Sequence, residues 1–151
     1  MKMKNLIFAA IIALGIGSFV LNGRGAASHA EYTLERTPEV IAVTFTSAWC
    51  SACKIIEPRL AKVIPQFSQQ PVKFVEIDLT FGQRDEINEQ ARRDGVLDIY
   101  RQYKGATGFT LLVDATTGDV IDSLTINHSR AAMRAAISQS IARATSTTTN
   151  N

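Results

Sequence analysis

Both cysteines of this 151-residue chain lie in one short stretch, Trp-Cys-Ser-Ala-Cys-Lys at residues 49–54. Two thiols with two residues between them can form a disulfide, exchange it with another disulfide, or bind a metal ion. As a structural crosslink the pair would close a very small loop, which the chain-entropy relation values at only about 2 kcal/mol. The spacing of Cys50 and Cys53 therefore favours chemistry over a structural crosslink.

Metal binding and haem attachment each lack a residue that they require. A closed zinc site takes about four ligands, and the chain has only two histidines, His29 and His128, both distant from the cysteines in the sequence. Covalent haem attachment needs a histidine directly after the second cysteine, where this chain has Lys54. We therefore predict no metal and no cofactor, and a metal-delivery protein that uses the two thiolates alone remains as an alternative.

The elements around the cysteines favour redox chemistry. Residues 40–45 form a β-branched apolar run typical of a buried strand, and apolar residues at three- and four-residue steps predict a helix over 52–67, kinked at Pro58. Cys50 then lies at a helix N-terminus, where backbone N–H groups stabilise a thiolate. We predict that Cys50 is the nucleophile, and that Cys53, one turn later and further inside, resolves the mixed disulfide.

The rest of the chain supplies the other elements of an α/β domain. We predict a strand over 72–78, a helical region over 84–103 interrupted at Gly95, strands over 109–114 and 120–126, and a last helix after Ser129. The short turn at 115–119 makes the last two strands an antiparallel hairpin. The first strand–helix–strand unit requires a parallel crossover, so the sheet is mixed and has helices on both faces.

The arrangement strand, Trp-Cys-x-x-Cys-Lys, helix, with Pro58 five residues after Cys53, resembles the thioredoxin superfamily. The resemblance covers roughly residues 35–144, because residues 107–114, Gly118 and the last helix also resemble the family's strand–turn–strand and final helix. It implies a thioredoxin-like fold with a central mixed sheet of four to five strands flanked by helices, in the order βαβ-α-ββα. It also implies disulfide exchange with protein thiols and disulfides, and a redox protein as electron donor or acceptor.

The resemblance further implies a substrate groove around Trp49, Cys50, Gly108 and Phe109, and two of its key positions differ here. Family members have a cis-proline where this chain has Phe109, and the reductive members have a buried aspartate where it has Thr44. We expect a trans bond before Phe109, because a cis bond there would cost about 2.5–4 kcal/mol, and we expect its ring beside Trp49. With no acid at Thr44, the proton of Cys53 would go to water, or to Glu76 if that residue faces the site.

Residues 1–30 have the three parts of an export signal: Lys2 and Lys4, an apolar stretch over 6–21, and small residues before a cleavage site after Ala30. The apolar stretch is short for a membrane span, so we predict cleavage and an exported protein, periplasmic if the source is a Gram-negative bacterium. The alternative is an uncleaved anchor that holds the domain outside the cytoplasm, which would be the only membrane contact. The domain prediction is a leader at 1–30, a thioredoxin-like domain at 31–144 and a disordered tail at 145–151.

Charge argues against a nucleic-acid partner. Three of the 16 basic residues lie in the leader, so 13 basic and 14 acidic residues remain and the net charge from residue 31 onward is −1. A nucleic-acid binder would carry a basic patch there. The sequence thus predicts an exported thiol–disulfide oxidoreductase, with the reductase direction favoured because Trp-Cys-x-x-Cys-Lys is nearest to the reducing members. The alternative is a thioredoxin-fold module that binds a protein partner and has little generic catalytic activity.

Overall fold

The computed structural model describes residues 37–81 and 84–149, so the predicted leader lies outside the described residues. Four strands form one sheet in the order β2-β1-β3-β4. Their bounds are β1 Val40–Thr46, β2 Val72–Asp78, β3 Phe109–Asp114 and β4 Val120–Leu124. The helices are α2 Cys53–Leu60, the short 3-10 helix η1 Ile64–Phe67, α3 Arg84–Arg93, α4 Leu97–Tyr103 and α5 Arg130–Thr149.

The strand pairing confirms the predicted mixed sheet. β1 runs parallel to β2 and antiparallel to β3, and β3 and β4 form the predicted antiparallel hairpin. In this register Thr44 is paired with Glu76 on β2 and with Thr110 on β3. The helical region over 84–103 divides at Gly95, which has a positive φ of 77° that a residue with a side chain rarely adopts.

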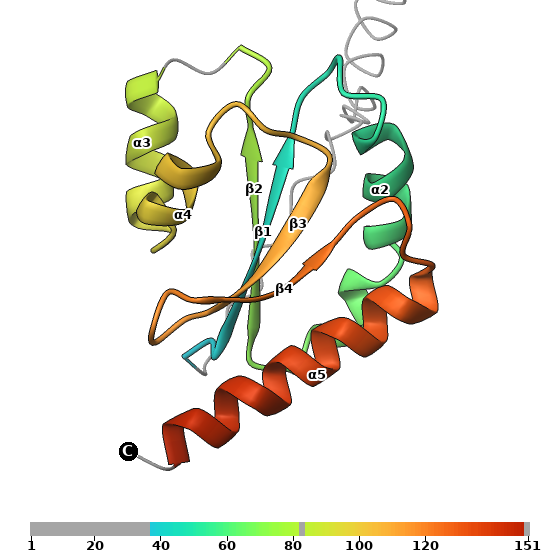
Figure 1. Ribbon diagram of the computed structural model, residues 1–151, viewed down its shortest axis with the longest axis vertical. Coiled ribbons are helices and arrows are strands. Elements are labelled where there is room, and N and C mark those ends of the chain that lie inside the picture. The colour runs from blue at the N-terminus through green and yellow to red at the C-terminus, as the bar shows by residue number, and fades with distance from the viewer. Residues whose placement is uncertain (1–36, 82–83, 150–151) are drawn as a thin grey trace, which may run out of the picture. The chain divides into compact units, whose positions relative to one another are not determined.

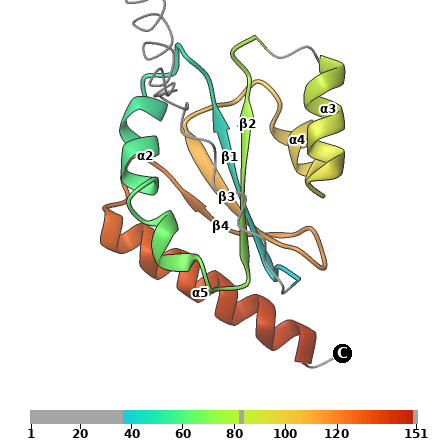
Figure 2. The same cartoon turned by 180° about the vertical axis from the view of Figure 1, so that it is seen from behind.

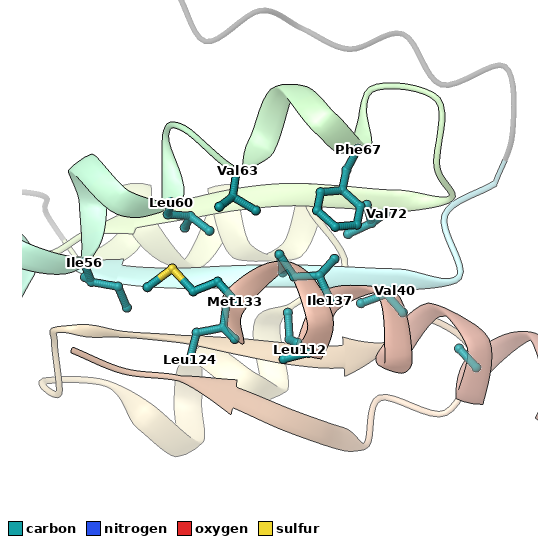
Figure 3. Packing of buried hydrophobic residues seen from close by; sticks show 13 residues of the cluster. Val40, Ile56, Leu60, Val63, Phe67, Val72, Leu112, Leu124, Met133 and Ile137 are labelled. Carbon is teal, nitrogen blue, oxygen red and sulfur yellow. The ribbon is translucent and has the colours of Figure 1, made fainter. Parts of the chain in front are cut away.

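Helices cover both faces of the sheet, with α2 and α5 on one face and α3 and α4 on the other (Figures 1 and 2). Because side chains alternate along a strand, β1 contributes to two separate cores. Val40 and Ala42 pack with α2 and α5, and Figure 3 shows Ile56 and Ile137 in that cluster. Ile41, Val43 and Phe45 pack with α3 and α4 on the other face. Thr44 and Thr46 therefore face the α2 side, below the cysteines.

Two sequence predictions need correction. The helix predicted over 52–67 ends at Leu60, and a turn follows before η1, whose first turn contains Pro65. Proline lacks an N–H and is tolerated best in the first turn of a helix, so a new helix can begin at Pro65. Pro58, by contrast, lies inside α2.

The disordered tail predicted at 145–151 is wrong for residues 145–149, which continue α5. The hydroxyl of Thr145 donates to the carboxylate of Glu39 and to the carbonyl of Ile141, and Ala144 is buried in the core. The polar composition of this segment favoured disorder, but these contacts hold its start against the rest of the domain. Within the residues that the structure describes, no helix is both long and apolar enough to cross a membrane.

Candidate functional site

Cys50 lies in the loop between β1 and α2, Cys53 is the first residue of α2, and the two form a disulfide. The backbone N–H of Cys53 donates to Sγ of Cys50 over 3.0 Å. Cys50 is 8% exposed and Cys53 2% exposed, so the second cysteine is the deeper of the two, as predicted. The start of α2 thus offers a backbone donor to the Cys50 sulfur, which favours the anionic form of a thiol at that position.

A short network holds the loop that leads to Cys50. The Thr80 hydroxyl accepts a hydrogen bond from the Ala48 N–H over 2.8 Å and donates to the carboxylate of Asp78 over 2.5 Å. The N–H of Cys50 donates to the carbonyl of Ser47. The loop before the cysteines is therefore tied to the end of β2, which fixes where α2 begins.

Gly108 lies directly against the cysteines, as the resemblance implied. A Cβ at this position would come within 2.6 Å of Cβ of Ala52 and 3.3 Å of Sγ of Cys50, and φ is +93°. The Gly108 N–H donates to the carbonyl of Phe45 over 2.8 Å, so this amide is already used inside the protein. The bond to Phe109 is trans, since no described peptide bond is cis.

The expectation that the ring of Phe109 lies beside Trp49 is wrong. Phe109 pairs with Phe45 in the sheet, and the two rings stack at 5.2 Å, with Tyr103 6.0 Å from Phe109. Strand alternation directs this side chain to the face that α3 and α4 cover. The ring of Phe109 is therefore part of the core on the far side of the sheet from α2.

The ring that does meet Trp49 belongs to Phe81, a residue that the sequence analysis did not single out. The two rings make an edge-to-face contact at 5.8 Å, although Trp49 is 66% exposed and Phe81 88% exposed. Exposed aromatic side chains in contact often mark a binding surface. No signal in the sequence distinguished Phe81, because the loop that brings it to Trp49 is set by the end of β2.

A cleft of about 770 Å³ opens beside Cys53. Its lining includes four carboxylates and two cations, namely Glu57, Glu76, Asp78, Glu86, Lys54 and Arg93. Glu76 is exposed and faces this cleft, as considered from the sequence. Glu57 was missed, because its relation to the site depends on the way α2 packs over β1.

Three threonines lie on the sheet face below α2. The hydroxyl of Thr44 is hydrogen-bonded to that of Thr110 at 2.9 Å, and both side chains are buried. Two residues further along β1, the hydroxyl of Thr46 donates to the carboxylate of Glu57. The place of the family's buried acid is thus filled by a pair of neutral hydroxyls, and the carboxylate that reaches this face comes from α2.

In the described part of the chain, no three or more His, Cys, Asp or Glu side chains are arranged to hold a metal ion. His128, the one histidine described, accepts a hydrogen bond at Nδ1 from the Thr125 N–H and lies in the loop before α5. Its environment gives it a structural role in that loop.

Comparison with protein families finds one match, to the family described as Thioredoxin, over residues 26–99. No curated protein matches the chain. The matched segment contains β1, the two cysteines, α2, β2 and α3. It therefore spans the elements that position the disulfide.

Several solved structures are similar to the chain. A thiol:disulfide interchange protein of the thioredoxin family from Chlorobium tepidum is 19% identical, with 68% of this chain and 80% of that chain covered and a TM-score of 0.47. Fasciola hepatica thioredoxin is 20% identical, with 68% and 82% covered and a TM-score of 0.42. StoA from Bacillus subtilis is 11% identical, with 68% and 84% covered and a TM-score of 0.47.

Proposed function

We propose that this chain, which belongs to the thioredoxin superfamily, is an exported thiol–disulfide oxidoreductase that reduces protein disulfides. One observation carries the proposal. Cys50 and Cys53 are bonded to each other at the start of α2, and the N–H of Cys53 donates to the sulfur of Cys50. A dithiol that closes into this disulfide releases two electrons to a substrate.

The reaction would proceed in two exchanges. The thiolate of Cys50 attacks one sulfur of a substrate disulfide, which forms a mixed disulfide and releases the other sulfur as a thiolate. The thiolate of Cys53 then attacks Sγ of Cys50, breaks the mixed disulfide and releases the second substrate thiolate. The substrate gains two electrons and the protein becomes the Cys50–Cys53 disulfide, which a redox protein that donates electrons must reduce again.

Cys50 fits the first step better than Cys53, because it is the more exposed residue of the two and its sulfur has the backbone donor. Trp49 and Phe81 offer an aromatic surface next to it. A substrate would then be held mainly by its side chains around the reactive disulfide. The Gly108 N–H, which an extended substrate would pair with in the wider family, is bonded to Phe45 instead.

Export is part of the proposal and rests on the first 30 residues. The positive start, the apolar stretch and the small residues at Ser28 and Ala30 match an export signal. Outside the cytoplasm a dithiol is exposed to oxidising conditions. A reductase there depends on a dedicated electron donor.

The test is the reduction of insulin disulfides by the purified domain, together with the reduction potential of the Cys50–Cys53 pair. We expect turnover in the presence of a dithiol donor and a reduction potential of about −270 mV, as for a reducing thioredoxin. The variant Cys50→Ser is the matched control and should have no activity. A reduction potential of about −120 mV would overturn the reductase direction and indicate an oxidant.

The exposed Trp49–Phe81 pair favours one second candidate, a module that binds a protein partner with little generic catalysis. The two candidates differ in what the cysteines contribute. A binding module should keep its partner when both cysteines are replaced by serine, whereas an oxidoreductase should lose both turnover and its covalent intermediates.

A further inference from the structure

The second exchange requires that Cys53 lose a proton while it is almost completely buried. Burial in an apolar environment disfavours the thiolate, so a nearby proton acceptor would accelerate this step. Thr44 cannot act as that acceptor, because a threonine hydroxyl is not a base at neutral pH and this one is bonded to Thr110. The acceptor must come from another element.

Glu57 occupies the right place on α2. It follows Cys53 by four residues, so the two side chains lie on the same face of the helix, where Cβ atoms are about 5–6 Å apart. The Thr46 hydroxyl donates to the Glu57 carboxylate, which holds that carboxylate against the end of β1. Thr46, Cys53 and Glu57 all line the same cleft.

We propose that Glu57, oriented by Thr46, accepts the proton of the Cys53 thiol when Cys53 resolves the mixed disulfide. The inference rests on the proposed oxidoreductase function and adds a residue to it. The Cys53 S–H bond breaks as the proton passes to the Glu57 carboxylate, directly or along water in the cleft. The thiolate attacks Sγ of Cys50, the substrate sulfur leaves with the electron pair of the broken S–S bond, and the proton then passes from Glu57 to that thiolate or to solvent.

The other ionisable groups that face the cleft are less suited to this task. Asp78 accepts two hydrogen bonds from Thr80, at the N–H and at the hydroxyl. Glu86 and Arg93 lie on α3 and Glu76 lies on β2, so none of these side chains shares a helix with Cys53. Lys54 lies on α2, where its side chain is exposed. Among these groups, Glu57 alone combines a carboxylate, the helix of Cys53 and a hydrogen bond that ties it to β1.

The test separates the two exchanges in time. The reduced protein is mixed with excess dithionitrobenzoate, a disulfide that releases one coloured thiolate when Cys50 attacks and a second when Cys53 resolves. For Glu57→Gln we expect a first phase within about twofold of wild type and a second phase at least about tenfold slower near pH 6. The deficit should shrink as the pH approaches about 9, where hydroxide deprotonates Cys53 without an acceptor.

Three further variants control for the loss of a charge, for the carboxylate itself and for its orientation. Glu86→Gln removes a carboxylate from the same cleft and should leave both phases within about twofold of wild type. Glu57→Asp keeps the carboxylate and should recover part of the second phase, while Thr46→Val should slow that phase less than Glu57→Gln does. Urea unfolding of each variant reports whether the fold is retained.

Three outcomes would overturn the inference: a second phase unchanged in Glu57→Gln, a deficit that does not vary with pH, or a deficit found in Glu76→Gln instead. If the first phase is absent from the wild-type protein, the proposed oxidoreductase function itself is wrong. The two failures are therefore distinguishable in one experiment.

Discussion

The hydroxyls of Thr44 and Thr110 form a buried hydrogen bond, 2.9 Å long, that joins β1 to β3 beneath the start of α2. Removing one partner leaves the other hydroxyl buried without its bond. We expect Thr44→Val or Thr110→Val to lower the free energy of unfolding by about 1–3 kcal/mol each. The double variant should lose less stability than the sum of the two single losses, because two apolar side chains leave no hydroxyl without a hydrogen bond. Urea titration measures all three, and simple additivity would contradict the pairing.

Gly108 and Gly105 provide a matched pair for testing the close approach to the cysteines. Both have a positive φ, but a Cβ at Gly105 would meet no atom within 4 Å, whereas one at Gly108 would meet Ala52 and Cys50. We expect Gly105→Ala to cost about 1 kcal/mol from backbone strain alone. Gly108→Ala should cost clearly more and should slow alkylation or reduction at Cys50. Equal losses of stability in the two variants would show that the contact is unimportant.

The roles of the two cysteines predict different trapping behaviour. Cys53→Ala removes the resolving thiol, so mixed disulfides between Cys50 and its partners should accumulate and appear on non-reducing gels. Cys50→Ala should trap few partners, because Cys53 is almost fully buried. Equal trapping by both variants, or faster labelling of Cys53 than of Cys50 by iodoacetamide in the reduced protein, would reverse the assignment.

Phe109 should now behave as a core residue. Its ring stacks on Phe45 and lies 6.0 Å from Tyr103, so Phe109→Pro removes these contacts even though proline is the family's residue there. We expect the free energy of unfolding of that variant to be about 2 kcal/mol or more below that of wild type. Phe109→Leu should lose less stability, because it keeps part of the apolar volume. A Phe109→Pro protein of unchanged stability would place the ring outside the core.

Export predicts a defined mature N-terminus. Intact-mass measurement of protein recovered from the exported fraction should give a chain that begins at Glu31, or near Ala27 if cleavage occurs at the small residues Gly25–Ala27 instead. Full-length chain recovered from membranes would indicate the uncleaved anchor instead.

Much of the fold could be predicted from local patterns. The bounds of β2 and β3 follow directly from apolar runs, and Gly95 marks the break between α3 and α4 because its positive φ disfavours any other residue. The end of α2 at Leu60 was not evident, since the apolar periodicity continues past it and only the packing decides where the helix stops.

The candidate site could also be predicted only in part from the sequence. Cys50 and Cys53 are identified by spacing alone, and the position of Gly108 against them follows from the family pattern. The Thr46–Glu57 and Trp49–Phe81 contacts join residues from different elements, so no local pattern contains them. The position of the Phe109 ring depends on which face of β3 it occupies, and the register with Phe45 decides that.

The packing of α5 also bears on when the protein can fold. Met133 and Ile137 complete the cluster that contains Val40 and Leu112 (Figure 3), and α5 follows every strand in the chain. During synthesis, the part of this sheet face that α5 covers therefore stays open until α5 has emerged, although α2 on the same face is made earlier, so this core is completed last. If the chain is exported as proposed, a core that is completed last would favour an unfolded chain during passage across a membrane.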